Sequence, residues 1–302
     1  MRNDQGLVLI DTGYYMFNRY FATLKWYRIV KKESVDVAHL HENEEFVNAF
    51  KGHVLGDIMK LAMYPYITKK YGPRLPQKNK KIRNKVIFCL DCPRAKIWRM
   101  TKYPQYKGTR KQAVDMNINI VGIFHAYVDG LIGGTEAFPP QFPDAGKEMG
   151  LAKISMDGLE ADDIVYLMLK RLRTEGYATP VLVMTNDNDF MQMVPMDAIV
   201  VNAKGVHLVE RVNHDPTTST MIKVLTGDVS DNIKPVPCIG ANPNTALSVA
   251  NMNEKSRLAW IKEHGGVPCT KAYTLNKKLI LLNLIPQPLA QNFHASLVVK
   301  VI

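Results

Sequence analysis

Three short apolar runs, each leading into an aspartate, limit most strongly what this chain can fold into. The runs and their acids are Leu7–Ile10 before Asp11, Val86–Leu90 before Asp91, and Val181–Met184 before Asp187. Continuous apolar runs of this length are typical of strands that are buried on both faces of a parallel sheet. Ligands of such sheets bind beyond the carboxyl ends of the strands, so we expect the three carboxylates to meet at one site.

Helical patterns lie between these runs, which predicts an α/β fold with a parallel sheet. Residues 44–64 carry apolar side chains at helical spacing. A helix over Glu160–Glu175 is predicted more strongly, because Asp162 and Asp163 suit the first turn, where the helix dipole favours carboxylates. Gly176 can end that helix in a left-handed conformation.

The remaining segments predict a loop, a hairpin and a second domain. Residues 130–150 are rich in Gly and Pro and predict a long loop. Residues 198–209 predict a β-hairpin across Asn202-Ala203-Lys204-Gly205. From about residue 213 the chain has a helical pattern with Pro and Gly punctuation. We therefore expect two domains, one at 1–213 and a helical one at 214–302.

Basic residues are concentrated in one part of the chain. The whole sequence has 39 lysines and arginines against 28 acidic residues, a net charge of +11. Between Ile58 and Val114 there are sixteen basic residues, interleaved aromatic residues and one acid, Asp91. Basic side chains neutralise phosphates and aromatic rings stack on unpaired bases, so this segment favours a nucleic-acid partner. The alternative is a solvated charged face with core aromatics.

Composition excludes several other classes of protein. Four cysteines in 302 residues do not make a disulfide scaffold and are typical of a reducing compartment. No apolar run approaches the roughly 18 residues that span a bilayer, and the N-terminus does not resemble a secretory signal. We therefore expect a protein of the cytoplasm with no membrane partner.

Acidic residues gather in short motifs, although the chain as a whole is basic. Clustered carboxylates repel one another and raise each other's pKa, and a divalent cation removes that conflict. Hard oxygen ligands suit magnesium or manganese. One or two of these acids could simply cap a helix, but that reading does not account for the whole set. The nine candidates are Asp11, Asp91, Glu160, Asp162, Asp163, Asp187, Asp189, Asp228 and Asp231.

In their order along the chain, these motifs resemble the structure-specific 5′-nuclease family of flap endonucleases, polymerase I 5′-nuclease domains and phage 5′-exonucleases. Trp98-Arg99 and the run Lys278–Pro286 look most like the ribonuclease H branch of that family in T-even bacteriophages. The segments that carry the family resemblance are Asp11, Phe88–Asp91, Trp98-Arg99, Tyr103–Arg110, Leu159–Asp163, Thr185–Gln192 and Leu225–Ile233.

The resemblance implies a PIN-like parallel-sheet nuclease domain flanked by helices, with a smaller helix-three-turn-helix domain. It implies 5′–3′ exonuclease and flap endonuclease activity that removes RNA primers and adjacent DNA during lagging-strand replication. Two Mg²⁺ ions, replaceable by Mn²⁺, would be held by carboxylates. The implied ligands are Asp11, Asp91, Asp162 and Asp187 for one ion and Asp189, Asp228 and Asp231 for the other, with Glu160 and Asp163 completing the cluster.

Basic and aromatic residues near the second strand are the implied nucleic-acid contacts. Lys107 and Arg110 match the family's basic residues beside the active site, where positive charge stabilises a reacting phosphate, and Lys111 extends this group. Tyr106 could stack on a terminal base, or it could be packed in the core. Arg99 could hold a phosphate, or it could form a salt bridge to one of the carboxylates.

Residues 220–250 resemble the family's helix-three-turn-helix, which grips a duplex backbone and often holds K⁺. Gly240 would allow close approach of a phosphate there. The segment Ala241–Asn244 departs from the family's small-residue run. This departure argues against the K⁺ site more than against the catalytic site. The expected partners are branched, nicked or flapped DNA and RNA/DNA hybrid, with a single-strand-binding protein or sliding clamp as further candidates, and we expect a monomer.

Two other readings stay open at this point. The chain could be a catalytically silent protein that binds branched DNA, although its acid set is complete. It could also be a PIN-type ribonuclease, which would share the sheet and the acids but not the helical C-terminal half.

Overall fold

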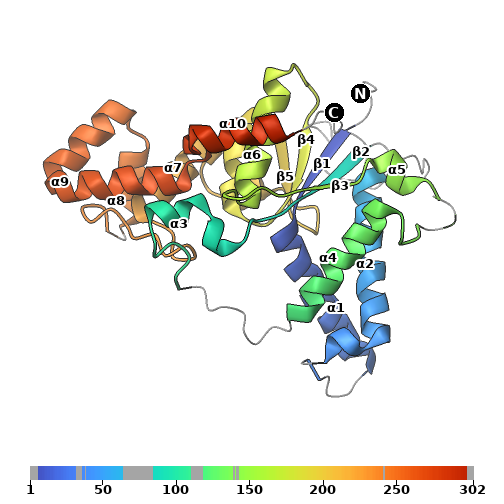
Figure 1. The fold of residues 1–302 in the computed structure, drawn as a ribbon. Coiled ribbons are helices and arrows are strands. Elements are labelled where there is room, and N and C mark those ends of the chain that lie inside the picture. The colour runs from blue at the N-terminus through green and yellow to red at the C-terminus, as the bar shows by residue number, and fades with distance from the viewer. Residues whose placement is uncertain are drawn as a thin grey trace.

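The computed structural model has the α/β architecture that the sequence predicts (Figure 1). Five parallel strands form one sheet in the order β3-β2-β1-β4-β5. Their bounds are β1 Gly6–Asp11, β2 Asn84–Cys89, β3 Ala152–Ile154, β4 Val181–Met184 and β5 Ala198–Val201. The structure describes residues 6–31, 36–37, 39–63, 84–109, 118–138, 140, 143–240 and 242–297.

Strand residues alternate between two hydrophobic cores, one on each face of the sheet. In β1, Val8 and Ile10 face one core, while Leu7 and Leu9 face the other. This burial on both sides explains why the strands are continuous apolar runs. The first core packs against α1 Thr12–Lys31, α2 Glu44–Met63, α4 Ile118–Gly133 and α5 Ala145–Met149. The second packs against α6 Ala161–Thr174, η3 Asn188–Met196 and α10 Gln287–Ser296.

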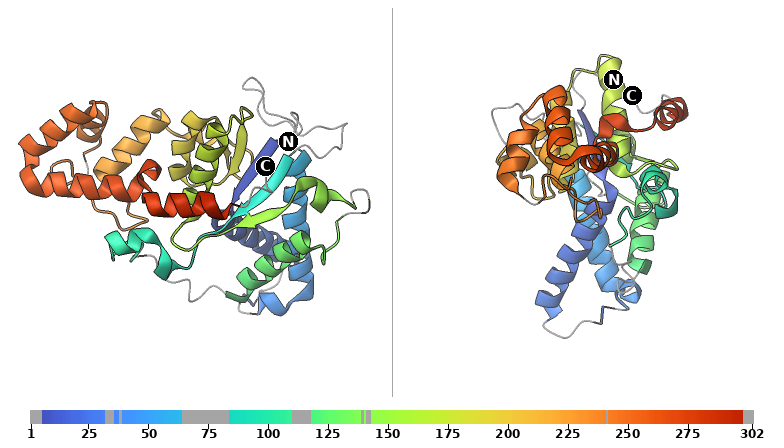
Figure 2. Two further views of the ribbon diagram at one scale, coloured as in Figure 1. Left: turned by 45° about the horizontal axis from the view of Figure 1, so that its top comes forward. Right: turned by 90° about the vertical axis from the view of Figure 1, so that its left-hand side faces the viewer.

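The remaining helices of the C-terminal part form a third core, and they extend to one side of the sheet (Figure 2). Ile97 and Tyr106, from the segment after β2, are buried in this core as well. The helices concerned are α7 Pro216–Thr226, α8 Pro243–Ala250 and α9 Glu254–Ile280. Short helical turns join the larger elements: η1 Leu40–Glu42, η2 Arg94–Lys96, α3 Trp98–Lys102, η4 Leu208–Arg211 and η5 Leu282–Leu284. We keep the division into 1–213 and 214–302 as a proposal.

The two helices predicted from spacing are confirmed. The predicted helix at 44–64 is α2, and the one at 160–175 is α6. Glu160 is the N-cap of α6, and its side chain and that of Asp163 form a reciprocal capping box. Gly176, with φ of +80°, follows the helix in the left-handed conformation.

Two predictions about connections are wrong. Residues 130–150 do not form one long loop, because α4 continues to Gly133 and α5 occupies Ala145–Met149. The predicted hairpin at 198–209 has only its first strand, which pairs in parallel with β4. A single antiparallel bridge links Val201 to His207, and the chain then turns into η4. Among the residues described, no helix is long and apolar enough to cross a membrane.

The return of α10 to the sheet gives a test of how the C-terminus contributes to stability. Phe293 is 1% exposed in the core beneath α6. Phe293→Ala should lower the free energy of unfolding by about 3–5 kcal/mol, because it removes a buried ring and leaves a cavity. Urea unfolding followed by circular dichroism measures this, with Gln291→Ala on the exposed face of α10 as the control. Equal stability of the two variants would contradict this packing.

Candidate active site

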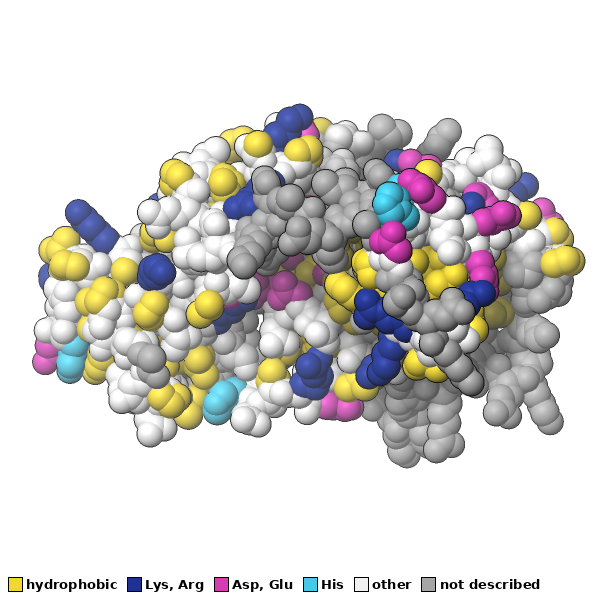
Figure 3. All heavy atoms as spheres, turned by 90° about the horizontal axis from the view of Figure 1, so that it is seen from below, with side chains coloured by type: hydrophobic (Ala, Val, Ile, Leu, Met, Phe, Trp, Pro, Cys, Tyr) yellow, Lys and Arg dark blue, Asp and Glu magenta, His cyan; other side chains and the backbone are white. Residues whose placement is uncertain are grey.

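One cavity of about 560 Å³ lies at the carboxyl ends of the strands. Asp11 ends β1, Asp91 lies two residues beyond β2, and Asp187 lies three residues beyond β4. Seen from below, acidic side chains gather in the hollow centre of this face (Figure 3). Eight of the nine predicted acids line the cavity: Asp11, Asp91, Glu160, Asp162, Asp187, Asp189, Asp228 and Asp231.

Hydrogen bonds from neighbouring elements fix the acids of the first two strands. The Oδ1 atom of Asp11 accepts from the backbone N–H of Tyr14 at 3.1 Å, and Oδ2 accepts from the Thr185 hydroxyl at 2.6 Å. Asp91 accepts from the backbone N–H of Ala161 at 2.7 Å, which ties the end of β2 to the start of α6. Burial, together with the nearby charges of Asp91 and Asp187, raises the pKa of Asp11 to about 7.

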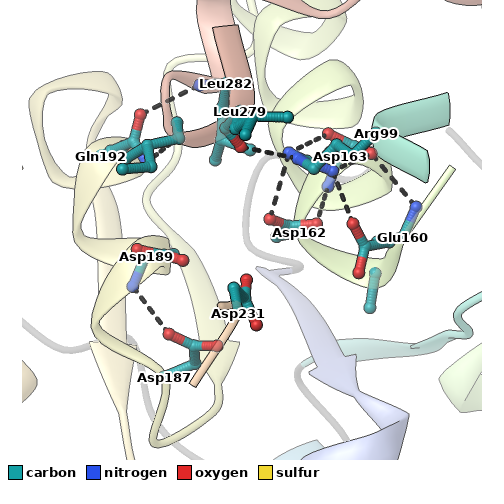
Figure 4. Close-up of polar contacts among 12 residues, drawn as sticks. Arg99, Glu160, Asp162, Asp163, Asp187, Asp189, Gln192, Asp231, Leu279 and Leu282 are labelled. Atoms are coloured by element: carbon teal, nitrogen blue, oxygen red, sulfur yellow. Dashed lines mark hydrogen bonds and ion pairs between the residues drawn. The ribbon is translucent and has the colours of Figure 1, made fainter. Parts of the chain in front are cut away.

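A buried arginine organises the acids at the start of α6 (Figure 4). Arg99 is 1% exposed and bonds Glu160 at 2.8 Å. It also forms two parallel bonds to Asp163, at 2.8 and 2.9 Å. Bidentate pairs of this kind are strong and directional. Burial and the charges of Asp163 and Glu160 raise the pKa of Asp162 well above its usual range, although Arg99 opposes this rise.

Asp163 is the one predicted acid that does not line the cavity. It is fully buried, and its oxygens accept from Arg99, from the Trp98 indole at 3.0 Å and from the backbone N–H of Glu160 at 3.2 Å. Its oxygens lie within 4.8 Å of those of Glu160 and Asp162, but these donors already occupy them. Its role in this structure is to hold Arg99.

Arg99 and Tyr106 were predicted to contact nucleic acid, and the structure shows both side chains buried and bonded to carboxylates. Arg99 is enclosed by carboxylates and also donates to the backbone oxygen of Leu279 at 2.8 Å. Tyr106 is 3% exposed, and its hydroxyl bonds Glu160 at 3.1 Å and Asp231 at 2.9 Å. These are the contacts of the alternative interpretations, a salt bridge for Arg99 and packing for Tyr106, while the contacts with nucleic acid stay a prediction.

The second acidic group contains a lysine that the sequence analysis missed. The carboxylates of Asp189, Asp228 and Asp231 lie within 4.8 Å of one another. Lys223, on α7, places its ammonium 2.5 Å from Asp189 and 2.6 Å from Asp228. Despite the raising effect of burial, this lysine and Ser230 lower the pKa of Asp228. Burial raises the pKa of Asp189 to about 6 in spite of the same lysine.

Lys107 is placed at the cavity, as predicted. Its side chain is 15% exposed and forms an ion pair with Glu160, which also lines the cavity. Arg110 and Lys111 lie outside the described residues. Gly240 has φ of +58° and open space where a side chain would stand, while its predicted contact with nucleic acid stays a prediction. Phe17 was not predicted to belong to the site; it lines the cavity from α1 and is 38% exposed.

The donor set fits hard divalent cations. Among the described residues that line the cavity, the ionisable ligands are carboxylates, and none is cysteine or histidine. Oxygen-only sites of this kind suit Mg²⁺ or Mn²⁺ and disfavour zinc. The fold and the cavity thus define a class of protein: an α/β protein with an acidic metal site at the carboxyl end of a parallel sheet and a lysine beside it.

Comparison with known proteins narrows this class. Residues 74–221 match the family model of the 5′-3′ exonuclease N-terminal resolvase-like domain. DNA polymerase I of Mycobacterium bovis is 27% identical over 180 residues, which are 56% of this chain and 16% of the polymerase. The 5′-3′ exonuclease of Buchnera aphidicola is 26% identical over 57% of this chain and 55% of its own length. This chain therefore matches only part of the length of these curated relatives.

Solved structures support the same fold. The D15 protein of bacteriophage T5, co-crystallised with metal ions, has a TM-score of 0.57 at 14% identity, over 96% of this chain and 97% of its own. A complex of the T5 D15 flap endonuclease with DNA and metal ions has the same TM-score and coverage. The PIN-like fold expected from the sequence is thereby confirmed. The match to the 5′-3′ exonuclease family model covers just under half of the chain.

The buried ion pairs of Arg99 allow a test of the site's architecture. Arg99→Met should lower the free energy of unfolding by about 3–5 kcal/mol in EDTA, because it leaves Glu160 and Asp163 buried without their cation. Arg99→Lys should recover part of this loss, since it keeps the charge but not the two parallel bonds. Urea unfolding at pH 7 should give wild type the highest free energy of unfolding, Arg99→Lys an intermediate value and Arg99→Met the lowest. The exposed Arg28→Met is the control. Arg99→Met as stable as Arg28→Met would disprove the role.

The raised pKa of Asp11 predicts a pH dependence of stability in EDTA. The folded protein holds a proton on Asp11 up to about pH 7, whereas the unfolded chain loses it near 3.8. Asp11 therefore stabilises the fold at low pH, and this contribution disappears as the pH rises from 4 to above 7. A shift of this size corresponds to at most roughly 4 kcal/mol.

Asp11→Asn should make the metal-free protein more stable than wild type at pH 8 and similar at pH 4. Urea unfolding across this pH range measures the difference, with the exposed Asp144→Asn as control. Parallel pH profiles of wild type and Asp11→Asn would rule out the ionisation of Asp11 as a source of instability.

Proposed function

We propose that this chain is a metal-dependent 5′-nuclease that hydrolyses phosphodiester bonds at 5′ ends, both stepwise and at flap junctions. The observation that carries the proposal is the convergence of eight carboxylates on one cavity, with Lys107 at its wall. The high net positive charge of the chain supports a polyanionic substrate. The family match supports the reaction class.

The residues of the cavity divide the work of this reaction among them. Two divalent ions bound to the carboxylates would supply an activated water and stabilise the leaving oxygen. Lys107 would neutralise charge that develops on the scissile phosphate. Tyr106 holds Glu160 and Asp231 in place through its hydroxyl. Phe17 presents an exposed aromatic ring at the cavity, where a base at the 5′ end could stack.

The finer features of the function belong to the same proposal. The ions would be Mg²⁺, with Mn²⁺ as a substitute, and K⁺ would bind in residues 220–250. The substrates would be flapped or nicked DNA and RNA/DNA hybrid, so that the enzyme has ribonuclease H activity of the T-even phage type. It would work as a monomer in the cytoplasm, during removal of RNA primers, beside a single-strand-binding protein or a clamp.

The two other readings are less well supported by the site. A silent DNA-binding protein would not need the acids of three strand ends, and here these acids are intact and held by specific hydrogen bonds. A PIN-type ribonuclease would not need the helices α7–α9. Here α7 contributes Lys223 to the site itself.

Cleavage of labelled substrates tests the proposed function. A 3′-labelled nicked duplex with an RNA primer and a 5′-flap duplex should be cut from the 5′ end or at the junction with Mg²⁺ and not with EDTA. Asp91→Asn and Asp187→Asn should each lower kcat by at least about 100-fold, because each removes a charged ligand at the cavity. Glu263→Gln, an exposed acid of α9, is the matched control. Tight binding without cleavage would favour the silent reading.

A further inference from the structure

The segment that carries Lys107 has no regular secondary structure of its own, yet it is held firmly against another loop. Residues 103–109 follow the short helix α3 as a series of turns. The loop Asp228–Ile233, which supplies two acids to the cavity, lies directly beside them. We propose that Asn232 is a positioning residue that holds Lys107 at the scissile phosphate. This inference rests on the proposed function.

Three hydrogen bonds connect the two segments. The side-chain amide of Asn232 donates to the backbone oxygen of Gln105 at 2.8 Å. The Tyr103 hydroxyl donates to the backbone oxygen of Asn232 at 3.1 Å. The backbone N–H of Lys107 donates to the backbone oxygen of Asp231 at 2.8 Å. Hydrogen bonds therefore hold this turn at two residues before Lys107, Tyr103 and Gln105, and at Lys107 itself.

The backbone of Lys107 needs this support. Its φ is +55°, a left-handed conformation that costs a residue with a Cβ roughly 1 kcal/mol. The next residue, Gly108, donates to Gln105 O at 2.8 Å, and a Cβ there would lie only 2.8 Å from the same oxygen. The oxygen of Gln105 thus accepts from both Gly108 and Asn232. Losing the amide of Asn232 would loosen the turn at its centre.

Asn232 is well suited to this position because its own loop is rigid. Its φ is +57°, and asparagine tolerates the left-handed region better than most residues. Two backbone bonds between Asp228 and Ile233, at 2.9 and 2.7 Å, close the loop. Gly227 precedes it with φ of +76°, where a Cβ would lie 2.3 Å from the backbone oxygen of Ile233. The loop is therefore closed and tightly packed, and it holds Asn232 in one place.

The loop Asp228–Ile233 also places the carboxylate of Asp231 at the cavity. Asp231 accepts from the Tyr106 hydroxyl at 2.9 Å, while its backbone oxygen accepts from Lys107. One loop thereby places an acid of the second group and the lysine that faces the substrate. Removing the Asn232 side chain should disturb the lysine and leave the acids in place, because its amide donates to a backbone oxygen and not to a carboxylate.

The decisive variant is Asn232→Gly, which removes the amide and keeps the left-handed backbone accessible. We expect kcat to fall about 3- to 10-fold with little change in KM, in line with the loss of one positioning hydrogen bond. Amide hydrogen exchange should become faster at residues 106–108. Asp197→Gly is the matched control: Asp197 is an exposed residue with φ of +57°, and its variant should behave as wild type.

A double-mutant cycle separates positioning from a general structural effect. Lys107→Ala alone should lower kcat strongly, and adding Asn232→Gly should cause no further loss, because the amide acts through the lysine. Tyr103→Phe should show the same dependence on Lys107. Full activity of Asn232→Gly, or losses that multiply in the double variant, would overturn the inference.

The experiment also separates this inference from the proposed function. If wild type cuts neither substrate, or if Lys107→Ala retains full activity, the proposed function or the role of the lysine is wrong. Hydrogen exchange at residues 106–108 still reports on the docking in that case. Unchanged exchange in Asn232→Gly would show that the amide does not hold the turn.

Discussion

Repulsion among carboxylates at the end of the sheet is the constraint on which the rest of the structure depends. Eight acids share one cavity of about 560 Å³, and burial raises the pKa of several of them. Like charges at such distances cannot all ionise without compensation. The chain supplies part of that compensation with its own cations. Arg99 pairs with the acids at the start of α6, Lys223 pairs with Asp189 and Asp228, and Lys107 pairs with Glu160 at the cavity wall.

The three cations come from two parts of the chain, and these two parts meet in the third core. Arg99 lies on α3, and Lys107 on the turns that follow it. Lys223 lies on α7, whose next two residues, Val224 and Leu225, are buried in the third core. That core also encloses Ile97 and Tyr106, so its packing brings the segment after β2 against the C-terminal helices. The electrostatic balance of the cavity is therefore a consequence of how the helical part docks on the sheet.

The sequence predicts the sheet and the acids well, because both depend on local rules. A continuous apolar run followed by Asp indicates a buried strand and its carboxyl end, and Asp11, Asp91 and Asp187 all lie at the cavity. The roles of Asp163 and Arg99 could not be predicted in the same way. Asp163 shares its helical turn with Asp162, and its contacts with the side chains of Trp98 and Arg99, which are distant in the sequence, distinguish the two acids.

Lys223 was missed because it lies five residues before Asp228, in a helix whose lysine looks like an ordinary surface charge. The failed hairpin has a similar cause. After β5 the segment Val206–Val209 is mostly apolar, as strands are, but it forms one bridge, from His207 to Val201, before the chain turns into η4. Tertiary contacts decided both cases.

The cations differ in where they lie, and this difference explains how the site can bind metal ions and the protein can still fold. Arg99 and Asp163 are sealed from solvent, so this pair stabilises the start of α6 whether or not an ion is bound. Lys223 and Lys107 instead contact acids that line the cavity, where a bound cation would compete with them for the same carboxylate oxygens. The cation that supports the start of α6 is therefore not one of those that a bound metal ion would displace.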